Sequence, residues 1–104
     1  MLPKYSRLRA KEVAEVIARG KGKRGDFLSL KLANSDSPFR CAVVVSKKVS
    51  KSAVRRNKLR RAVYRAVLAT SLPSSGHAIL FVQSSPMRIS AASFIPDIKK
   101  LLHV

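Results

Sequence analysis

Phosphate-binding side chains are concentrated in one short stretch of this sequence. Nine of the nineteen residues in the range 47–65 are lysine or arginine, and none is acidic. Positive charge at this density repels itself, so a folded chain that carries it is expected to meet a polyanion. The chemistry that this stretch predicts is the neutralisation of nucleic-acid phosphates. The basic residues are Lys47, Lys48, Lys51, Arg55, Arg56, Lys58, Arg60, Arg61 and Arg65.

Side chains that could perform catalysis or hold a metal are sparse. The two histidines, His77 and His103, lie far apart without cysteine partners and make no metal-ligand set. The single cysteine, Cys41, excludes an internal disulfide, and its apolar surroundings indicate a core residue. We therefore predict no catalytic residue, no metal site and no cofactor bound by the protein alone. The carboxylates are scattered and lack the spacing of a metal clamp: Glu12, Glu15, Asp26, Asp36 and Asp97.

The second half of the basic stretch has the period of a helix. At 100° per residue, an arc of about 140° holds Leu59, Ala62, Val63, Ala66 and Val67. The far side holds Asn57, Lys58, Arg61 and Arg65, while one flank holds Arg56, Arg60 and Tyr64. Arg55 points toward the apolar arc from the first turn. The pattern predicts a helix that is capped by Ser50 or Ser52, ends near Ala69, and has one apolar and one basic face.

The remaining elements follow from apolar periodicity and turn residues. We expect a helix over residues 9–19 that stops at Gly20, with a core stripe of Val13, Val16 and Ile17. Strands are predicted at 27–33, 39–49 and 77–84, the first two paired as a hairpin around a turn at 34–38. The 39–49 strand is apolar on both faces, which favours a central position. A last helix should begin after Ser90 or Ser93, and Pro96, which is tolerated only in a first turn, favours Ser93 as the cap. Its predicted buried stripe is Phe94, Ile98, Leu101 and Leu102.

Length and composition indicate one domain with a modest core. The chain has 104 residues, 46% of them apolar, and a net charge of +17. The expected order of helix, strand, strand, helix, strand, helix is that of an α+β fold, an α/β sandwich with helices on one sheet. No apolar run is long enough to span a membrane, and the start lacks a secretory apolar centre, so we expect a cytoplasmic protein. The basic segment 20–26, GKGKRGD, is either a solvated loop or a phosphate contact.

Four segments, in order along the chain, resemble the protein subunit of bacterial ribonuclease P. They are LPKYSRLR near the start, the loop at Gly20, RCAVVVSKKVSKSAVRRNKLRR, and AILFVQ. The resemblance covers nearly the whole chain, as one domain over residues 1–104. It implies a fold like the second domain of ribosomal protein S5, in the order α-β-β-β-α-β-α. It further implies an extra short strand before Phe27 and a left-handed βαβ crossover, an exception to the right-handed rule.

The resemblance also implies a function. In this family a large RNA removes the 5′ leader from precursor tRNA by hydrolysis, and Mg²⁺ held by that RNA does the chemistry. The protein binds the leader and improves substrate and metal binding. The implied partners are the catalytic RNA and precursor tRNA, with no membrane and no small-molecule substrate.

Two surfaces of this chain match the family's motifs. The first is expected to bind the catalytic RNA through Lys47, Lys48, Arg55, Arg56, Asn57, Lys58, Arg60, Arg61 and Arg65. The second is a leader-binding cleft between the first helix and the sheet, assigned to Val13, Ile17, Phe27, Leu30 and Tyr64. Few of these are aromatic, so stacking on leader bases is expected to be weak. Tyr64 is interpreted either as a base-stacking residue or as cover for the core.

A structural RNA-binding module, such as a ribosomal protein, fits the charge and size equally well. Only the run from Val45 to Arg61 and its order favour ribonuclease P over that alternative. A duplex DNA reader would require helices before the basic helix, whereas two strands are predicted there.

Overall fold

The computed structural model describes residues 8–70 and 74–102. Seven elements follow one another along the chain. They are α1 (Ala10–Arg19), β1 (Lys21–Arg24), β2 (Leu28–Pro38), β3 (Arg40–Val45), α2 (Ala53–Leu68), β4 (Ser75–Val82) and α3 (Ala91–Leu102). The α+β prediction is confirmed, and β1 is the extra short strand that the resemblance implied.

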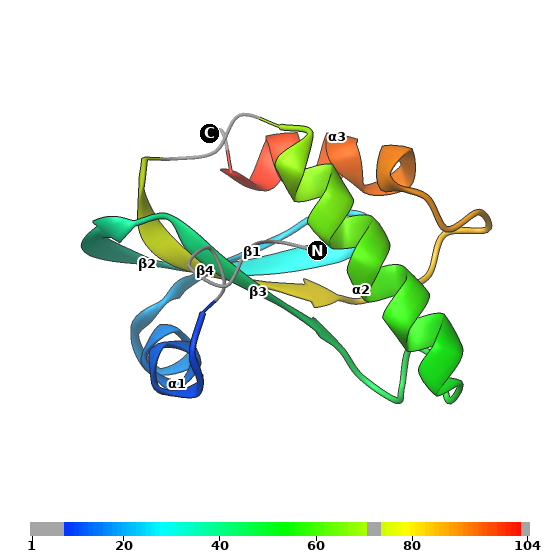
Figure 1. Ribbon diagram of the computed structural model, residues 1–104, viewed down its shortest axis with the longest axis horizontal. Coiled ribbons are helices and arrows are strands. Elements are labelled where there is room, and N and C mark those ends of the chain that lie inside the picture. The colour runs from blue at the N-terminus through cyan, green and yellow to red at the C-terminus, as the bar shows by residue number, and fades with distance from the viewer. Residues whose placement is uncertain (1–7, 71–73, 103–104) are drawn as a thin grey trace.

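The four strands form one sheet in the order β1-β2-β4-β3. β2 is antiparallel to both β1 and β4, whereas β3 and β4 are parallel. Parallel neighbours require a crossover, and α2 provides it. In Figure 1, α2 and α3 lie above the sheet, α1 lies below it, and β3 passes in front of β4, so the β3–α2–β4 crossover is left-handed. This arrangement keeps α1 and α2 on opposite faces.

The predicted hairpin between residues 27–33 and 39–49 is wrong. β2 continues through the expected turn to Pro38, with an irregular register between Ala33 and Pro38, and pairs with β4. β3 is therefore an edge strand, and β4 takes the central place, with nearly every residue buried. β3 also ends at Val45, earlier than expected, because a turn follows that is closed by the Val49 N–H donating to the Ser46 carbonyl.

The main core lies between the sheet and the pair α2 and α3. Apolar side chains from alternate positions of three strands face it, among them Leu28, Leu30, Cys41, Val43, Val45, Leu80 and Val82. From α2, the core receives every member of the apolar arc, Leu59, Ala62, Val63, Ala66 and Val67, and also Tyr64. Each fully buried leucine or valine among them stabilises the fold by about 1.5–3 kcal/mol relative to exposure.

α3 begins directly after Ser90 and not after Ser93, the start that Pro96 favoured. It starts at Ala91, so Pro96 lies inside the helix instead of in its first turn. The predicted stripe is confirmed, because Phe94, Ile98 and Leu101 are buried and Leu102 is half-buried. A proline at this position removes one backbone donor from the helix, and Pro96 is accommodated on the exposed side.

The stripe of α1 is only partly core. Val16 is fully buried, Val13 is half-buried, and Ile17 is 49% exposed. The helix ends at Gly20 as predicted, where the backbone N–H donates to the Val16 carbonyl at 2.7 Å. A Cβ at Gly20 would lie 2.5 Å from that carbonyl oxygen, so glycine permits this close approach.

Candidate nucleic-acid interface

The start of α2 is fixed by local hydrogen bonds. Ser52 is the N-cap, and its hydroxyl accepts the Arg55 N–H at 3.2 Å. The Arg56 guanidinium donates to the carbonyls of Ser50 and Lys51, both at 2.9 Å. This arginine therefore holds the turn before the helix against its first turn.

The exposed face of α2 is basic and extends along the helix. Asn57, Lys58, Arg61 and Arg65 are all exposed and lie opposite the buried arc. Arg60 is half-buried and donates to the Asn57 side-chain oxygen at 3.0 Å. The Arg55 guanidinium turns toward the loop after β4 and donates to the Ser85 hydroxyl at 3.0 Å.

No carboxylate neutralises this face within the part of the chain that the structure describes. The ion pairs found there involve Glu12 and Glu15, which belong to α1 on the opposite side of the sheet. Lys47 and Lys48 are exposed in the turn that precedes α2 and extend the charge beyond the helix. The helix therefore presents positive charges that no carboxylate neutralises, an arrangement that is typical of a polyanion-binding surface.

On the other sheet face, α1 is anchored at one end by a small cluster of charges. The Glu12 carboxylate accepts the Arg9 N–H at 2.9 Å and lies 3.2 Å from the Arg40 guanidinium. His77 Nε2 lies 3.5 Å from the same carboxylate without hydrogen-bond geometry. These contacts lower the pKa of Glu12, mainly through the Arg9 N–H, while partial burial opposes the shift and Arg40 adds to it. At the other end, Lys31 Nζ donates to the Ile17 carbonyl at 3.0 Å.

α1 leaves part of this sheet face uncovered. Val44 of β3 and Phe81 of β4 are register partners on the α1 side, opposite the core-facing Val43, Val45 and Leu80. Val44 is 39% exposed and Phe81 is half-buried. A hollow of about 220 Å³ lies at the ends of these strands, and it is lined by Val44, Ser46, Lys48, Val49, Phe81, Val82 and Gln83. Because Lys48 belongs to this lining, the hollow adjoins the turn that leads into α2.

The described residues show no cluster of side chains that could bind a metal ion or act as a nucleophile. No three His, Cys, Asp or Glu side chains among them lie together as a metal site. Burial raises the pKa of the Cys41 thiol to about 12, so this group is not a nucleophile near neutral pH. None of the described helices is both long and apolar enough to cross a bilayer.

Comparisons with known proteins agree with this geometry. A family model described as Ribonuclease P matches residues 2–104. This chain belongs to the ribonuclease P protein family. It is 48% identical to the ribonuclease P protein component of Pseudanabaena sp., over 66% of this chain and 65% of that relative. With the Picosynechococcus sp. protein component it shares 30% identity over 97% of this chain and 90% of the relative.

The fold likeness extends to solved structures. The ribonuclease P protein of Staphylococcus aureus superposes with a TM-score of 0.72 at 19% identity, covering 97% of this chain and all of that chain. The aligned part of the Pseudanabaena relative is slightly less than two thirds of its length.

The structure does not bring the five residues assigned to the ribonuclease P leader cleft to one surface. Val13 and Ile17 lie on α1, as the assignment requires. Leu30 and Tyr64 are buried in the core on the opposite sheet face, and Phe27 packs edge-on against Phe94 of α3 with ring centroids 6.2 Å apart. Burial makes Tyr64 a core residue, the second of the two interpretations.

Two residues of the uncovered face, Val44 and Phe81, were missed from the sequence. Alternation in AILFVQ separates Phe81 from the buried Leu80 and Val82, so the strand pattern did contain a signal. The strand pattern does not indicate which part of the sheet α1 leaves uncovered, because that depends on the order of the strands.

Proposed function

We propose that this chain is the protein subunit of a ribonuclease P ribonucleoprotein that acts in the cytoplasm. It assists a catalytic RNA in removing the 5′ leader from precursor tRNA, and the RNA, with its own Mg²⁺, performs the hydrolysis. The observation that carries this proposal is the unneutralised basic face of α2 in a chain of the ribonuclease P family. A phosphate-rich partner relieves the repulsion among these cations.

In this proposal α2 and the turn before it bind the catalytic RNA. Lys58, Arg61 and Arg65 are exposed and make no ion pair within the described residues, so they are available for phosphates. Arg56 and Arg60 have a double role, because each also holds local structure by a hydrogen bond. The proposed set is completed by Lys47, Lys48, Arg55 and Asn57.

The leader is proposed to lie on the α1 side of the sheet. The apolar residues proposed to contact it are Val13 and Ile17 of α1 and Val44 and Phe81 of the uncovered face. Phe81 provides the ring on which one base can stack, an interaction of about 1–3 kcal/mol. Lys48, which the proposal also assigns to the catalytic RNA, lines the hollow at Val44 and Phe81, so the leader and the catalytic RNA are proposed to meet at the turn before α2.

The test is reconstitution with a bacterial-type catalytic RNA and a precursor tRNA that carries a leader. We expect the protein to raise cleavage at low Mg²⁺ and to cleave nothing alone. Arg61→Ser with Arg65→Ser should weaken assembly and lower the magnitude of the log–log salt slope by about 0.7–0.9 for each phosphate that is no longer neutralised. A matched control removes two exposed lysines of α3, Lys99 and Lys100, and should leave assembly nearly unchanged.

Three results would overturn the proposal. Cleavage by protein alone that survives RNase treatment would place the active site in the protein. Equal loss of assembly in the α2 variant and the α3 control would show that only total charge matters. Recovery of ribosomal RNA in ribosome-like proportions from the purified native protein would instead support a structural RNA-binding module.

A further inference from the structure

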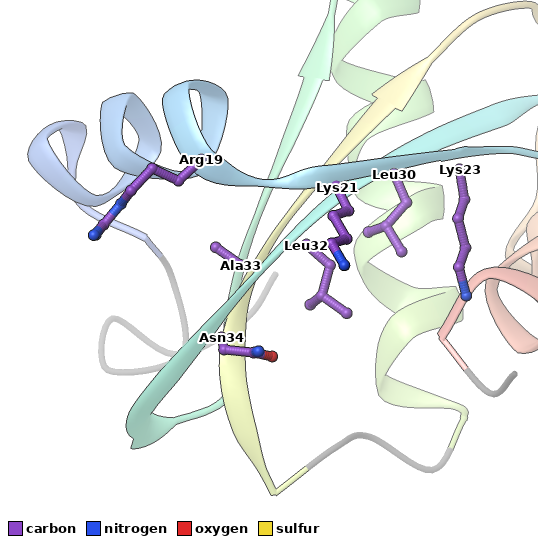
Figure 2. A pocket seen from close by; sticks show the side chains of 7 residues that line it. All are labelled: Arg19, Lys21, Lys23, Leu30, Leu32, Ala33 and Asn34. Atoms are coloured by element: carbon purple, nitrogen blue, oxygen red, sulfur yellow. The ribbon is translucent and has the colours of Figure 1, made fainter.

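A second hollow, of about 430 Å³, lies at β1 and β2 on the sheet face that also carries α2 and α3, and it shares no residue with the hollow at Val44 and Phe81. It is lined by Arg19, Lys21, Lys23, Leu30, Leu32, Ala33 and Asn34. Figure 2 shows Lys21, Lys23, Leu30 and Leu32 extending from the two strands toward the same side, with Asn34 below them. Arg19 stands apart at the end of α1 and points away from the others.

The strand register explains why cations and apolar groups meet here. Lys21 is paired with Leu32, and Lys23 with Leu30, so these four side chains project from one face of the β1–β2 ladder. Leu30 is buried and Leu32 is half-buried, which gives the hollow an apolar floor. Both lysines are exposed and form its rim.

The charge at this rim is not neutralised. Across the described residues neither Lys21 nor Lys23 forms an ion pair, and Arg19 has only an exposed contact with Glu15, at 3.6 Å. β1 is the edge strand farthest from β3, so this charge is separate from the turn before α2. The basic segment 20–26 is thus partly a strand, and its lysines are held in a fixed direction.

We infer that this hollow binds one nucleotide of single-stranded RNA. Lys21 and Lys23 hold its phosphate, the base lies against Leu32, and the Asn34 amide, on the same strand face as Leu32, is placed to hydrogen-bond the edge of the base. The inference rests on the proposed function, because it takes the partner to be RNA.

Size and chemistry favour a nucleotide over a bare phosphate. A volume of about 430 Å³ falls in the range of small-ligand pockets and exceeds what one phosphate fills. Apolar walls next to cations fit a base joined to a phosphate, whereas a phosphate alone gains nothing from Leu32. Double-stranded RNA does not expose single bases, so the strand must be unpaired.

The first experiment uses the isolated protein and nuclear magnetic resonance. A 5′-phosphorylated RNA trinucleotide should shift the amide signals of Lys21, Lys23, Leu32 and Asn34. Lys21→Ser with Lys23→Ser should weaken this binding roughly fivefold, the effect of removing two exposed ion pairs. The matched control, Lys99→Ser with Lys100→Ser, should change it less than about twofold.

Three outcomes would overturn the inference. The shifts could be confined to other surfaces, or the two double variants could weaken binding equally, which would indicate general attraction of anions. Ribose 5-phosphate could also bind as tightly as adenosine or uridine 5′-monophosphate, which would show that the base makes no contact with the apolar floor.

A second experiment separates the two possible sources of the nucleotide. If it comes from the substrate, Lys21→Ser with Lys23→Ser should remove the benefit of a longer leader while assembly with the catalytic RNA is kept. If it comes from the catalytic RNA, assembly should weaken for every leader length. If neither property changed, the site would be refuted while the α2 interface stayed intact, so its failure is distinguishable from failure of the proposed function.

Discussion

Asp97→Asn should destabilise the fold strongly although Asp97 lies in no proposed binding surface. The Asp97 carboxylate is buried in α3 and accepts three backbone N–H groups, from Asp26 at 3.2 Å, Phe27 at 2.7 Å and Leu28 at 2.9 Å. These bonds tie α3 to the turn between β1 and β2. The carboxylate takes the place of water as the acceptor for these N–H groups, which the turn would otherwise bury without a partner.

The size of the expected loss of stability follows from counting the hydrogen-bond acceptors that the substitution removes. Hydrogen bonds to a charged group contribute about 1.5–3 kcal/mol each, and an unsatisfied buried donor costs a similar amount. Asparagine keeps one oxygen acceptor and places an NH₂ donor where the second oxygen was, so at least one N–H loses its partner. We expect a loss of about 3 kcal/mol, or a fall in Tm of roughly 12–24 °C for a domain of this size.

Urea unfolding followed by circular dichroism measures this loss. Asp36→Asn is the matched control, because Asp36 is exposed and should change the free energy of unfolding by less than about 0.5 kcal/mol. If Asp97→Asn lowered the free energy of unfolding by less than about 1 kcal/mol with an unchanged m-value, the three hydrogen bonds of the carboxylate would not stabilise the fold as argued.

Three further predictions concern buried or constrained groups. The Cys41 thiol, with its pKa raised to about 12, should react with a thiol reagent at pH 8 only as fast as the protein unfolds, and rapid labelling of the native protein would contradict this. Because the pKa of Glu12 is lower in the folded than in the unfolded chain, its carboxylate stabilises the fold at pH values above its usual pKa of 4.5. The difference in free energy of unfolding between the original protein and Glu12→Gln, measured by parallel urea titrations, should therefore shrink as the pH falls through the lower, folded pKa. Pro96→Ala should raise the free energy of unfolding by about 1 kcal/mol, because it restores a donor for the Ala92 carbonyl, and a lower Tm would refute this.

The helices were predicted well because periodicity and capping depend only on residues that are near one another in the sequence. The arc of α2 and its Ser52 cap depend on neighbours within two turns, and both were found. Strand pairing depends on distant segments instead. The hairpin prediction assumed that consecutive strands pair, and it failed because the central place belongs to β4, which is later in the chain. The resemblance supplied the left-handed crossover, which no periodicity could have indicated.

The candidate surfaces divide in the same way. The basic face of α2 was readable because charges of one sign lie opposite an apolar arc on one helix. The proposed leader-binding surface could not be predicted in this way, because Val44 and Phe81 come from β3 and β4, whose places in the sheet were mispredicted. Leu30 illustrates the conflict. It shares one strand face with Leu28 and Leu32, a pattern that indicates a core position, whereas the resemblance assigns it to the cleft. The structure agrees with the alternation, since Leu30 is 1% exposed.

The few acids of this chain explain why its basic surfaces remain available. Glu12 holds the start of α1 against Arg40, Glu15 pairs with Arg19 within α1, and Asp97 is used by the backbone of the β1–β2 turn. Each of these carboxylates therefore serves local structure, and none reaches α2 or the rim at Lys21 and Lys23. With 22 basic residues against 5 acidic ones, the excess charge has to be neutralised from outside the chain. The fold places much of that excess on a helix face and an edge strand, whose backbone is already ordered, so little backbone ordering would oppose binding of the proposed RNA partner.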